Sequence, residues 1–251
     1  MPHTCYIANG LCHEPTADDP RRGQSEMRFF NPCDAQTSVR MTVYYTDRPP
    51  TDLPALHLPP KANPYWALPE KYPDAFTDCG PWGMRLVSDQ FIMVDHILIA
   101  GVKGRTEDIR YAGGVADVLA RPDLSHHWLF GDGLLLKLNP DGPAHQPHSQ
   151  FEWYHLLNPS AADAAVTMTC YYGDGSRDQF QYTIPAERVL LIDNHNLIKP
   201  NNAFGLVFVS TQPIVAEGTR LIRGHRSLDE WGAQIHTPRP GIPAPLEWVQ
   251  E

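Results

Sequence analysis

Residues 205–214 read Gly-Leu-Val-Phe-Val-Ser-Thr-Gln-Pro-Ile, and residues 83–92 read Gly-Met-Arg-Leu-Val-Ser-Asp-Gln-Phe-Ile. Both stretches fit Gly-x-x-x-x-Ser-x-Gln-x-Ile, and each is preceded by the same markers in the same order. The markers are an Asn-Pro pair, a segment that ends in Tyr-Tyr, and a proline: Asn158-Pro159, 166–172 and Pro185 in the later copy, and Asn31-Pro32, 39–45 and Pro59 in the earlier one. Self-similarity of this kind predicts one module written twice.

The repeated segments have the pattern of short strands. In residues 39–45, apolar and polar side chains alternate, which is typical of a half-buried strand. The 25 prolines and 18 glycines punctuate short apolar runs, which favours strands and turns over long helices. We therefore predict an all-β fold of two tandem antiparallel β-sandwich (jelly-roll-like) domains, residues 1–112 and residues 123–251, the second with a proline-rich C-terminal tail.

Residues 64–82 have no counterpart in the second copy. This segment is rich in aromatic residues and proline. It is either a loop packed over the sheet, which we favour, or one wall of a ligand pocket.

Composition excludes several classes of function. A length of 251 residues is enough for two small domains with separate cores. The net charge of -9 should repel phosphate backbones, so we expect no nucleic-acid partner. Five cysteines without a C-x-x-C pair indicate reduced thiols in a cytoplasmic protein. Apolar runs of signal or membrane-span length are missing from the sequence, so we expect neither secretion nor a membrane partner.

The second copy carries a further pattern. Residues 213–221 read Pro-Ile-Val-Ala-Glu-Gly-Thr-Arg-Leu, Glu152 stands six residues before Asn158, and residues 171–172 are Tyr-Tyr. Together these features resemble the sensory rhodopsin transducer family over most of residues 127–225, and more weakly over residues 4–101. The resemblance implies two compact β-sandwiches used as cytoplasmic small-molecule-binding domains, with sugars or sugar-derived metabolites as ligands and a tendency to form homo-oligomers.

Two positions depart from that family. The first turn of family members tends to read Ala-Glu-Gly, whereas this chain has Ala-Asn-Gly at residues 8–10 and Gly-Asp-Gly at residues 131–133. A carboxylate role at the turn is therefore expected only in the second copy. The histidine that often precedes Thr-Arg-Leu is Gly218 here, while the first copy has His96.

Arg220 is a candidate ligand-binding residue. Beside the small Gly218, its guanidinium could form a hydrogen-bonding fork for carboxylate or vicinal hydroxyl groups. An equally good interpretation is an arginine that holds Glu152 or Glu217 in a structural ion pair.

Glu152 and Glu217 are the candidate catalytic residues, and we predict Glu26 and Asp95 as their equivalents in the first copy. Two facing carboxylates would suit cleavage of a glycosidic bond. The sequence alone does not show that they face each other.

Histidine, asparagine and tryptophan side chains of the type that reads sugar hydroxyls complete the set of candidate residues. The loop from residue 193 to residue 202 carries His195 and Asn196, although asparagine is also a common turn residue. The remaining candidates for ligand binding are Trp153, His155, His96 and Glu26. Twelve histidines could support a metal site, but metal-binding spacing such as H-E-x-x-H is missing, so we assign no metal ligand and leave the cofactor unknown.

The function predicted from the sequence is binding of a small molecule, a carbohydrate or a sugar-derived metabolite, by a duplicated cytoplasmic β-sandwich that forms homo-oligomers. The alternative is a carbohydrate-active enzyme, a glycoside hydrolase, lyase or isomerase, that uses the paired carboxylates and histidines, with or without a metal. Neither a phosphate-binding glycine loop nor a nucleophile elbow supports a standard kinase or hydrolase.

Overall fold

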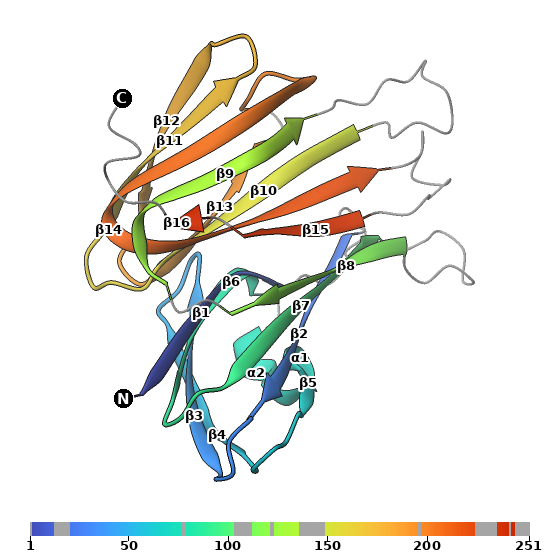
Figure 1. Cartoon of the computed structure of the whole chain (residues 1–251), viewed down its shortest axis with the longest axis vertical. Helices are drawn as coiled ribbons and strands as arrows, with labels where there is room; N and C mark the ends of the chain where they lie inside the picture. The colour runs from blue at the N-terminus through green and yellow to red at the C-terminus, as the bar shows by residue number, and fades with distance from the viewer. Residues whose placement is uncertain are drawn as a thin grey trace.

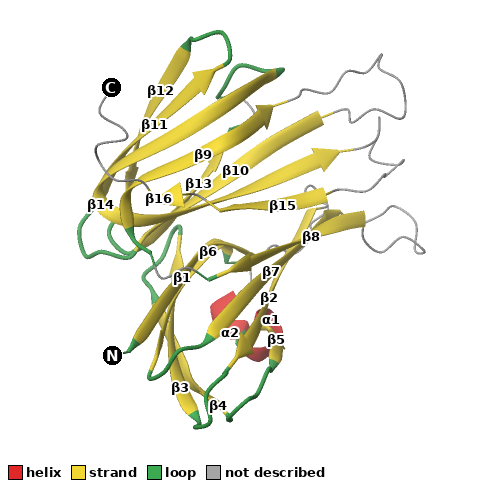
Figure 2. Ribbon diagram, viewed as in Figure 1, coloured by secondary structure: helices red, strands yellow, loops and turns green. Residues whose placement is uncertain are grey.

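Strands make up most of the protein (Figures 1 and 2). The structure, a computed structural model, describes residues 2–12, 21–76, 79–102, 112–120, 123–135, 149–194, 197–223, 235–240 and 242–243. Within these ranges the chain folds into two halves, the N-half (residues 2–120) and the C-half (residues 123–243), and the predicted all-β antiparallel fold is confirmed.

The N-half consists of two four-stranded antiparallel sheets. The first has the order β1 (His3–Cys12), β6 (Gly80–Ser88), β3 (Thr37–Tyr45), β4 (Thr51–Leu58). The second has the order β5 (Tyr65–Ala67), β2 (Arg21–Phe30), β7 (Met93–Val102), β8 (Ala112–Leu119). β8 begins at the predicted end of the first domain and pairs with β7, so this strand extends the second sheet of the N-half.

The aromatic segment, residues 64–82, packs on the N-half core. It contains β5 and two short helices, α1 (Leu68–Lys71) and α2 (Pro73–Phe76). Leu68 and Phe76 are buried in the core, and Trp66 packs against it. This segment is therefore a cover for the sheet, as the favoured interpretation of the sequence predicted.

The C-half repeats these pairings around one long strand, β14 (Asn202–Arg223). The first part of β14 pairs with β9 (Ser125–Leu135) and β11 (Ala164–Tyr172), as β6 pairs with β1 and β3. Its second part pairs with β10 (Ser149–Asn158) and β15 (Ile235–Pro240), as β7 pairs with β2 and β8. The remaining strands are β12 (Arg177–Ile184) beside β11, β13 (Arg188–Asp193) beside β10, and β16 (Ile242–Pro243) beside β9. Because β13 pairs with β10 as β5 pairs with β2, the prediction that residues 64–82 have no counterpart in the C-half is wrong for β5.

Local details recur in both halves. The Asn31 amide donates to the carbonyl oxygens of residues 35, 58 and 59 at 2.9, 3.2 and 2.9 Å. The Asn158 amide donates to those of residues 162, 184 and 185 at 2.9, 3.2 and 3.1 Å. Each asparagine thus ties its Asn-Pro turn to the loop after the neighbouring strand, and the loops contain the positive-φ residues Lys61 and Glu187 at matching positions.

The first strand of each half is bulged at the predicted Gly turn. The register of β1 on β6 shifts between Ile7 and Gly10, and that of β9 on β14 shifts at the matching point. A Cβ atom on Gly10 would lie 2.2 Å from the ring of Trp82, and one on Gly133 would lie 2.3 Å from the ring of Phe204. Glycine is required at both positions because an aromatic ring packs directly on the backbone.

Each half has its own hydrophobic core, and a third, smaller cluster joins the halves. We call this third cluster the seam, and it consists of Tyr6, Ala8, Tyr44, Leu157, Val189 and Val215. Gly83 lies in the seam too, where a Cβ atom would lie 3.1 Å from Val189 and 3.2 Å from Leu157. Its missing side chain allows the two halves to approach closely.

Candidate functional site

Strands β10 and β14 carry polar side chains on both faces of their sheet. Glu152 is the cross-strand partner of Arg220, and His155 is the partner of Glu217. Because successive side chains of a strand point to opposite faces, the first pair lies on the inner face of the C-half and the second pair on its outer face. Both glutamates are buried.

On the inner face, Glu152 and Arg220 form a buried ion pair. Glu152 Oε1 accepts hydrogen bonds from Arg220 Nε at 3.0 Å and from the Leu134 N–H at 3.2 Å. Arg220 Nη2 lies 2.9 Å from the same oxygen in an ion pair. The Tyr154 hydroxyl donates to Glu152 Oε2. Arg220 also contacts Asp132, through its backbone carbonyl and through Oδ2 at 3.3 Å.

This arrangement is a clamp on the bulge of β9, because Asp132 and Leu134 both belong to that strand. It supports the interpretation of Arg220 as a structural ion-pair residue, with Glu152 as the partner and not Glu217. In the N-half, an uncharged hydrogen bond holds the residue after the bulge: the Leu11 N–H donates to Ser25 Oγ at 3.2 Å.

The equivalence predicted for Glu26 is wrong by one position. Counted back from Asn31 and Asn158, the equivalent of Glu152 is Ser25, which contacts the residue after the N-half bulge as Glu152 contacts Leu134. Glu26 points to the opposite face, beside Tyr65. The physical reason is the period of two, since a shift of one residue moves a side chain to the other face. Asp95 does stand at the register position of Glu217.

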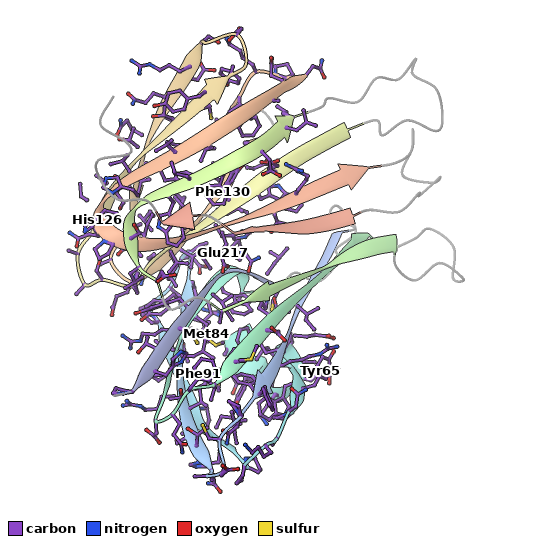
Figure 3. The ribbon with its side chains drawn as sticks, viewed as in Figure 1. Tyr65, Met84, Phe91, His126, Phe130 and Glu217 are labelled. Atoms are coloured by element: carbon purple, nitrogen blue, oxygen red, sulfur yellow. The ribbon has the colours of Figure 1, made fainter. Side chains whose placement is uncertain are left out.

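On the outer face, the Glu217 side chain lies between the two halves and contacts the backbone of the N-half (Figure 3). Its Oε2 accepts the Ala8 N–H at 2.8 Å and the Asn9 N–H at 2.9 Å. These two N–H groups belong to the β1 bulge, which turns them away from the ladder of β6. The Glu217 side chain is 1% exposed, so a buried carboxylate satisfies two backbone donors of the other half.

A histidine from each half lies near this contact. His96 Nδ1 lies 3.0 Å from Asn9 Oδ1, and because an amide oxygen only accepts, this contact places the proton on Nδ1. Burial lowers the pKa of His96 to about 3, with a smaller contribution from nearby His155. Burial lowers the pKa of His155 to about 4. Both imidazoles are therefore neutral at physiological pH.

Several buried polar atoms around the seam have no hydrogen-bond partner among the described residues. They are His96 Nε2, both ring nitrogens of His155, Asn9 Nδ2 and Thr219 Oγ1. Thr219 lies on the same face as Glu217 and opposite Trp153 on β10. Buried polar groups are almost always hydrogen-bonded to protein, water or a ligand. We therefore expect a water molecule or a polar ligand beside this cluster.

The predicted site residues therefore separate into groups. The structure gathers His96, His155 and Glu217 at the seam, whereas Glu152 and Arg220 lie on the other face of the sheet. The half-buried Trp153 packs against the C-half core. Glu152 and Glu217 do not share a cleft, contrary to what the paired-carboxylate hypothesis requires. His195 and Asn196 lie outside the described residues.

Sequence reasoning missed Asn9 and Thr219, which both belong to the cluster of buried polar atoms around the seam. Asn9 looked like a turn residue at a position where the family that the sequence resembles has an acid. Its position between the two halves depends on a contact that local pattern does not contain. Thr219 could have been found from the sequence, because it lies two residues after Glu217 and its side chain therefore points to the same face of the strand.

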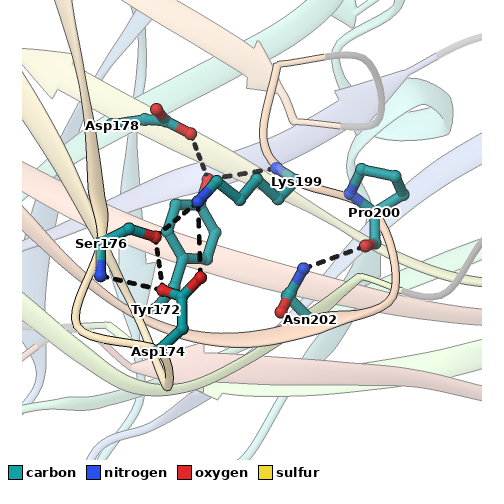
Figure 4. A network of polar contacts seen from close by, with 7 residues as sticks. All are labelled: Tyr172, Asp174, Ser176, Asp178, Lys199, Pro200 and Asn202. Atoms are coloured by element: carbon teal, nitrogen blue, oxygen red, sulfur yellow. Dashed lines mark hydrogen bonds and ion pairs between the residues drawn. The ribbon is translucent and has the colours of Figure 1, made fainter.

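A separate polar network lies at the end of the C-half (Figure 4). The Tyr172 hydroxyl donates to Asp178 Oδ2 at 2.7 Å and accepts the Lys199 N–H at 3.1 Å. Lys199 Nζ also contacts Ser176 and lies 3.7 Å from Asp174. Because Asp174 and Lys199 are exposed, this network ties a loop to the β11–β12 hairpin and forms no enclosed site.

Among the described side chains, no group of three or more His, Cys, Asp or Glu residues has the geometry of a metal site. Within the same part of the chain, no helix has both the length and the apolar character needed to cross a membrane.

The neutral histidines predict that acid weakens the fold. In the unfolded chain both imidazoles have a pKa near 6.5, so on acidification the unfolded state takes up protons first. Their contribution to stability is complete above that pH and is lost as the pH falls toward the folded pKa values. From about pH 7.5 to 5.5 we expect each histidine to lower the free energy of unfolding by about 1.4 kcal/mol. Urea unfolding across this range measures the effect, and His155→Gln should remove half of it; an unchanged slope would contradict the assignment.

Comparison with known proteins gives partial similarities. Neither a protein-family model nor a curated protein matches the sequence. Among solved structures, the Thermotoga maritima 1070 protein is 16% identical, with a TM-score of 0.38 over 48% of this chain and 97% of that one. The Anabaena sensory rhodopsin transducer is 27% identical, with a TM-score of 0.33 over 38% of this chain and 86% of that one. A Bacteroides uniformis beta-glucuronidase is 10% identical, with a TM-score of 0.18 over 87% of this chain and 25% of that one.

Proposed function

We propose that this chain consists of two tandem copies of one transducer-like β-sandwich and binds a small polar molecule at the seam between them. The matched strand pairings, the Asn31 and Asn158 hydrogen bonds and the paired glycine contacts support the duplication. The cluster of buried polar atoms without partners carries the binding proposal.

The chemistry of the cluster favours a neutral, hydroxyl-rich ligand of the carbohydrate class. Two neutral imidazoles, an amide and a hydroxyl offer both donors and acceptors at close quarters, which suits vicinal hydroxyl groups. Trp153 is the register partner of Thr219, and its half-buried ring is the aromatic surface that we propose covers a sugar ring. A free phosphate or a cation fits less well, because the histidines are held neutral by burial.

Removal of a single hydroxyl group tests the proposal. Thr219→Val keeps the shape of the side chain and removes Oγ1, so the free protein should keep its stability or gain some. Thermal shift is measured with a panel of neutral sugars and sugar acids, and native mass spectrometry looks for a small molecule that copurifies. We expect at least one sugar to raise the Tm of the natural chain. Thr219→Val should weaken the binding of that sugar by about 10-fold.

Thr167→Val is the matched control, since Thr167 lies on the outward face of β11 and bonds only the exposed Gln181 at 3.1 Å. It should leave the sugar affinity unchanged. Equal weakening by both valine variants, or the lack of any shift together with the lack of a copurifying molecule, would overturn the seam as a binding site.

A further inference from the structure

Two buried cysteines of the N-half lie next to each other where β1 ends and β6 begins (Figure 1). Cys12 is the last residue of β1 and is the register partner of Gly80, the first residue of β6. Cys79 immediately precedes Gly80 in the sequence. Both cysteines are free thiols and belong to the N-half core. The fold therefore brings together two thiols that are far apart in the sequence.

The conformation of Gly80 explains how the two thiols meet. Successive side chains of a regular strand point to opposite faces, so Cys79 would point away from the face of Cys12. Gly80 has a φ of 61°, which lies outside extended backbone and breaks this alternation. The Cys79 thiol forms a hydrogen bond with Cys12. Two thiols in such contact need only a small movement to reach the S–S bond length of about 2.0 Å.

The two sulfur atoms have different surroundings. The Trp82 indole Nε1–H donates to Cys12 Sγ at 3.3 Å, and the Cys79 thiol is a second donor to the same sulfur. Hydrogen bonds of this kind stabilise a negative charge on Cys12. The hydrogen bond to Cys12 and burial both raise the pKa of Cys79 above its usual value, so Cys79 keeps its proton. Cys12 is therefore the better nucleophile of the pair.

Two other buried cysteines provide a comparison. Burial raises the pKa of Cys5 and that of Cys170 to about 12. Such thiols are almost entirely protonated at neutral pH and react slowly. The Cys12 and Cys79 pair differs from them because each of its sulfur atoms has a second sulfur within hydrogen-bond reach.

From this geometry we propose that Cys12 and Cys79 are a redox-sensitive dithiol that a peroxide oxidises to a disulfide. The Cys12 thiolate attacks one oxygen of hydrogen peroxide and the O–O bond breaks, which leaves a sulfenic acid on Cys12 and releases water. The Cys79 sulfur then attacks Cys12 Sγ, and its proton leaves with the hydroxyl group as a second water molecule. The two thiols lose two electrons and two protons, and one peroxide is reduced to two water molecules.

The disulfide ties the end of β1 to the start of β6 beside the N-half bulge. Trp82, which donates to Cys12, also packs directly on Gly10. The same strand carries Ala8 and Asn9, whose N–H groups bind Glu217. A cross-link between distant parts of the sequence stabilises a protein mainly by restricting its unfolded chain. Oxidation should therefore strengthen the strand that contacts the C-half, whether or not a ligand binds at the seam.

Peptide mapping after oxidation tests the proposal. The chain carries Cys33→Ser, which removes a half-buried thiol outside the pair. It is reduced, treated with hydrogen peroxide while folded, and digested without reductant. Mass spectrometry should find a peptide that links Cys12 to Cys79, and two of the remaining thiols should disappear. The Tm should rise by about 5 to 10 °C, and a reductant should reverse the rise.

Single variants in the same background test the role of each sulfur. Cys79→Ser keeps the sulfur that reacts first, so Cys12 should accumulate as a sulfenic acid that dimedone labels. Cys12→Ser should give no label at Cys79. Cys5→Ser is the matched control, because it removes another buried thiol of the N-half, and it should keep the linked peptide.

Three results would each overturn the proposal. The first is a linked peptide that forms only after unfolding in urea, and the second is equal dimedone labelling of the Cys79→Ser and Cys12→Ser variants. The third is the lack of a linked peptide under conditions that oxidise Cys33 in the natural chain. The mapping of the linked peptide needs no substitution in the pair, so it gives an answer even where a single variant fails to fold.

Discussion

Replacement of Glu217 by alanine should lower the free energy of unfolding by about 3 to 4 kcal/mol, because two buried N–H groups lose a charged acceptor. The Ala8 and Asn9 N–H groups donate to the same oxygen, and both residues are completely buried. Urea unfolding measures the loss. Hydrogen exchange at these two amides gives a local readout, and their protection should fall more than that of the two cores.

Two further variants make the Glu217 result specific. Glu217→Gln keeps an oxygen that accepts both N–H groups, so it should cost about 1 kcal/mol. Asp52→Ala removes an exposed carboxylate that bonds Thr42 at 2.7 Å and should change stability by less than about 0.5 kcal/mol. If Glu217→Ala proved as mild as Asp52→Ala, the carboxylate would not join the halves.

Replacement of Arg220 by leucine should destabilise the protein by about 3 to 5 kcal/mol, since it leaves Glu152 buried without its counterion. Glu152 is completely buried, accepts a hydrogen bond from Arg220 Nε and forms an ion pair with Arg220 Nη2. Urea unfolding again measures the loss. Arg188→Leu is the control, because its guanidinium donates to the Glu187 carbonyl at 2.9 Å near the surface, and it should have an effect below about 0.5 kcal/mol.

The N-half suggests a compensating change. Ser25 and Leu98 occupy the register positions of Glu152 and Arg220. The double variant Glu152→Ser/Arg220→Leu therefore introduces the uncharged pair of the N-half into the C-half. It should recover about 2 kcal/mol of the loss caused by Arg220→Leu alone. A double variant less stable than the single one would show that the charge of Glu152 is not what makes the single variant unstable.

Alternation and punctuation in the sequence were sufficient for the class of fold. The period of two in residues 39–45 predicted β3, and the two Gly-x-x-x-x-Ser-x-Gln-x-Ile stretches became the end of β6 with the turn before β7 and the centre of β14. Part of the clamp was also predictable, since the ion pair of Arg220 with Glu152 was one of the interpretations of the sequence. Such features are readable because they depend on neighbours a few residues away.

The faces and the seam were not readable in the same way. A single-residue error in the equivalence of Glu26 reversed the direction of its side chain, because register is set by the whole pairing of β2 with β7. Glu217 was singled out as an acid beside Arg220, yet its partners are two N–H groups more than two hundred positions away. Local pattern specifies which residues alternate, and folding in three dimensions specifies what each face meets. The separation of the two glutamates and the polar cluster between the halves depend on the second of these.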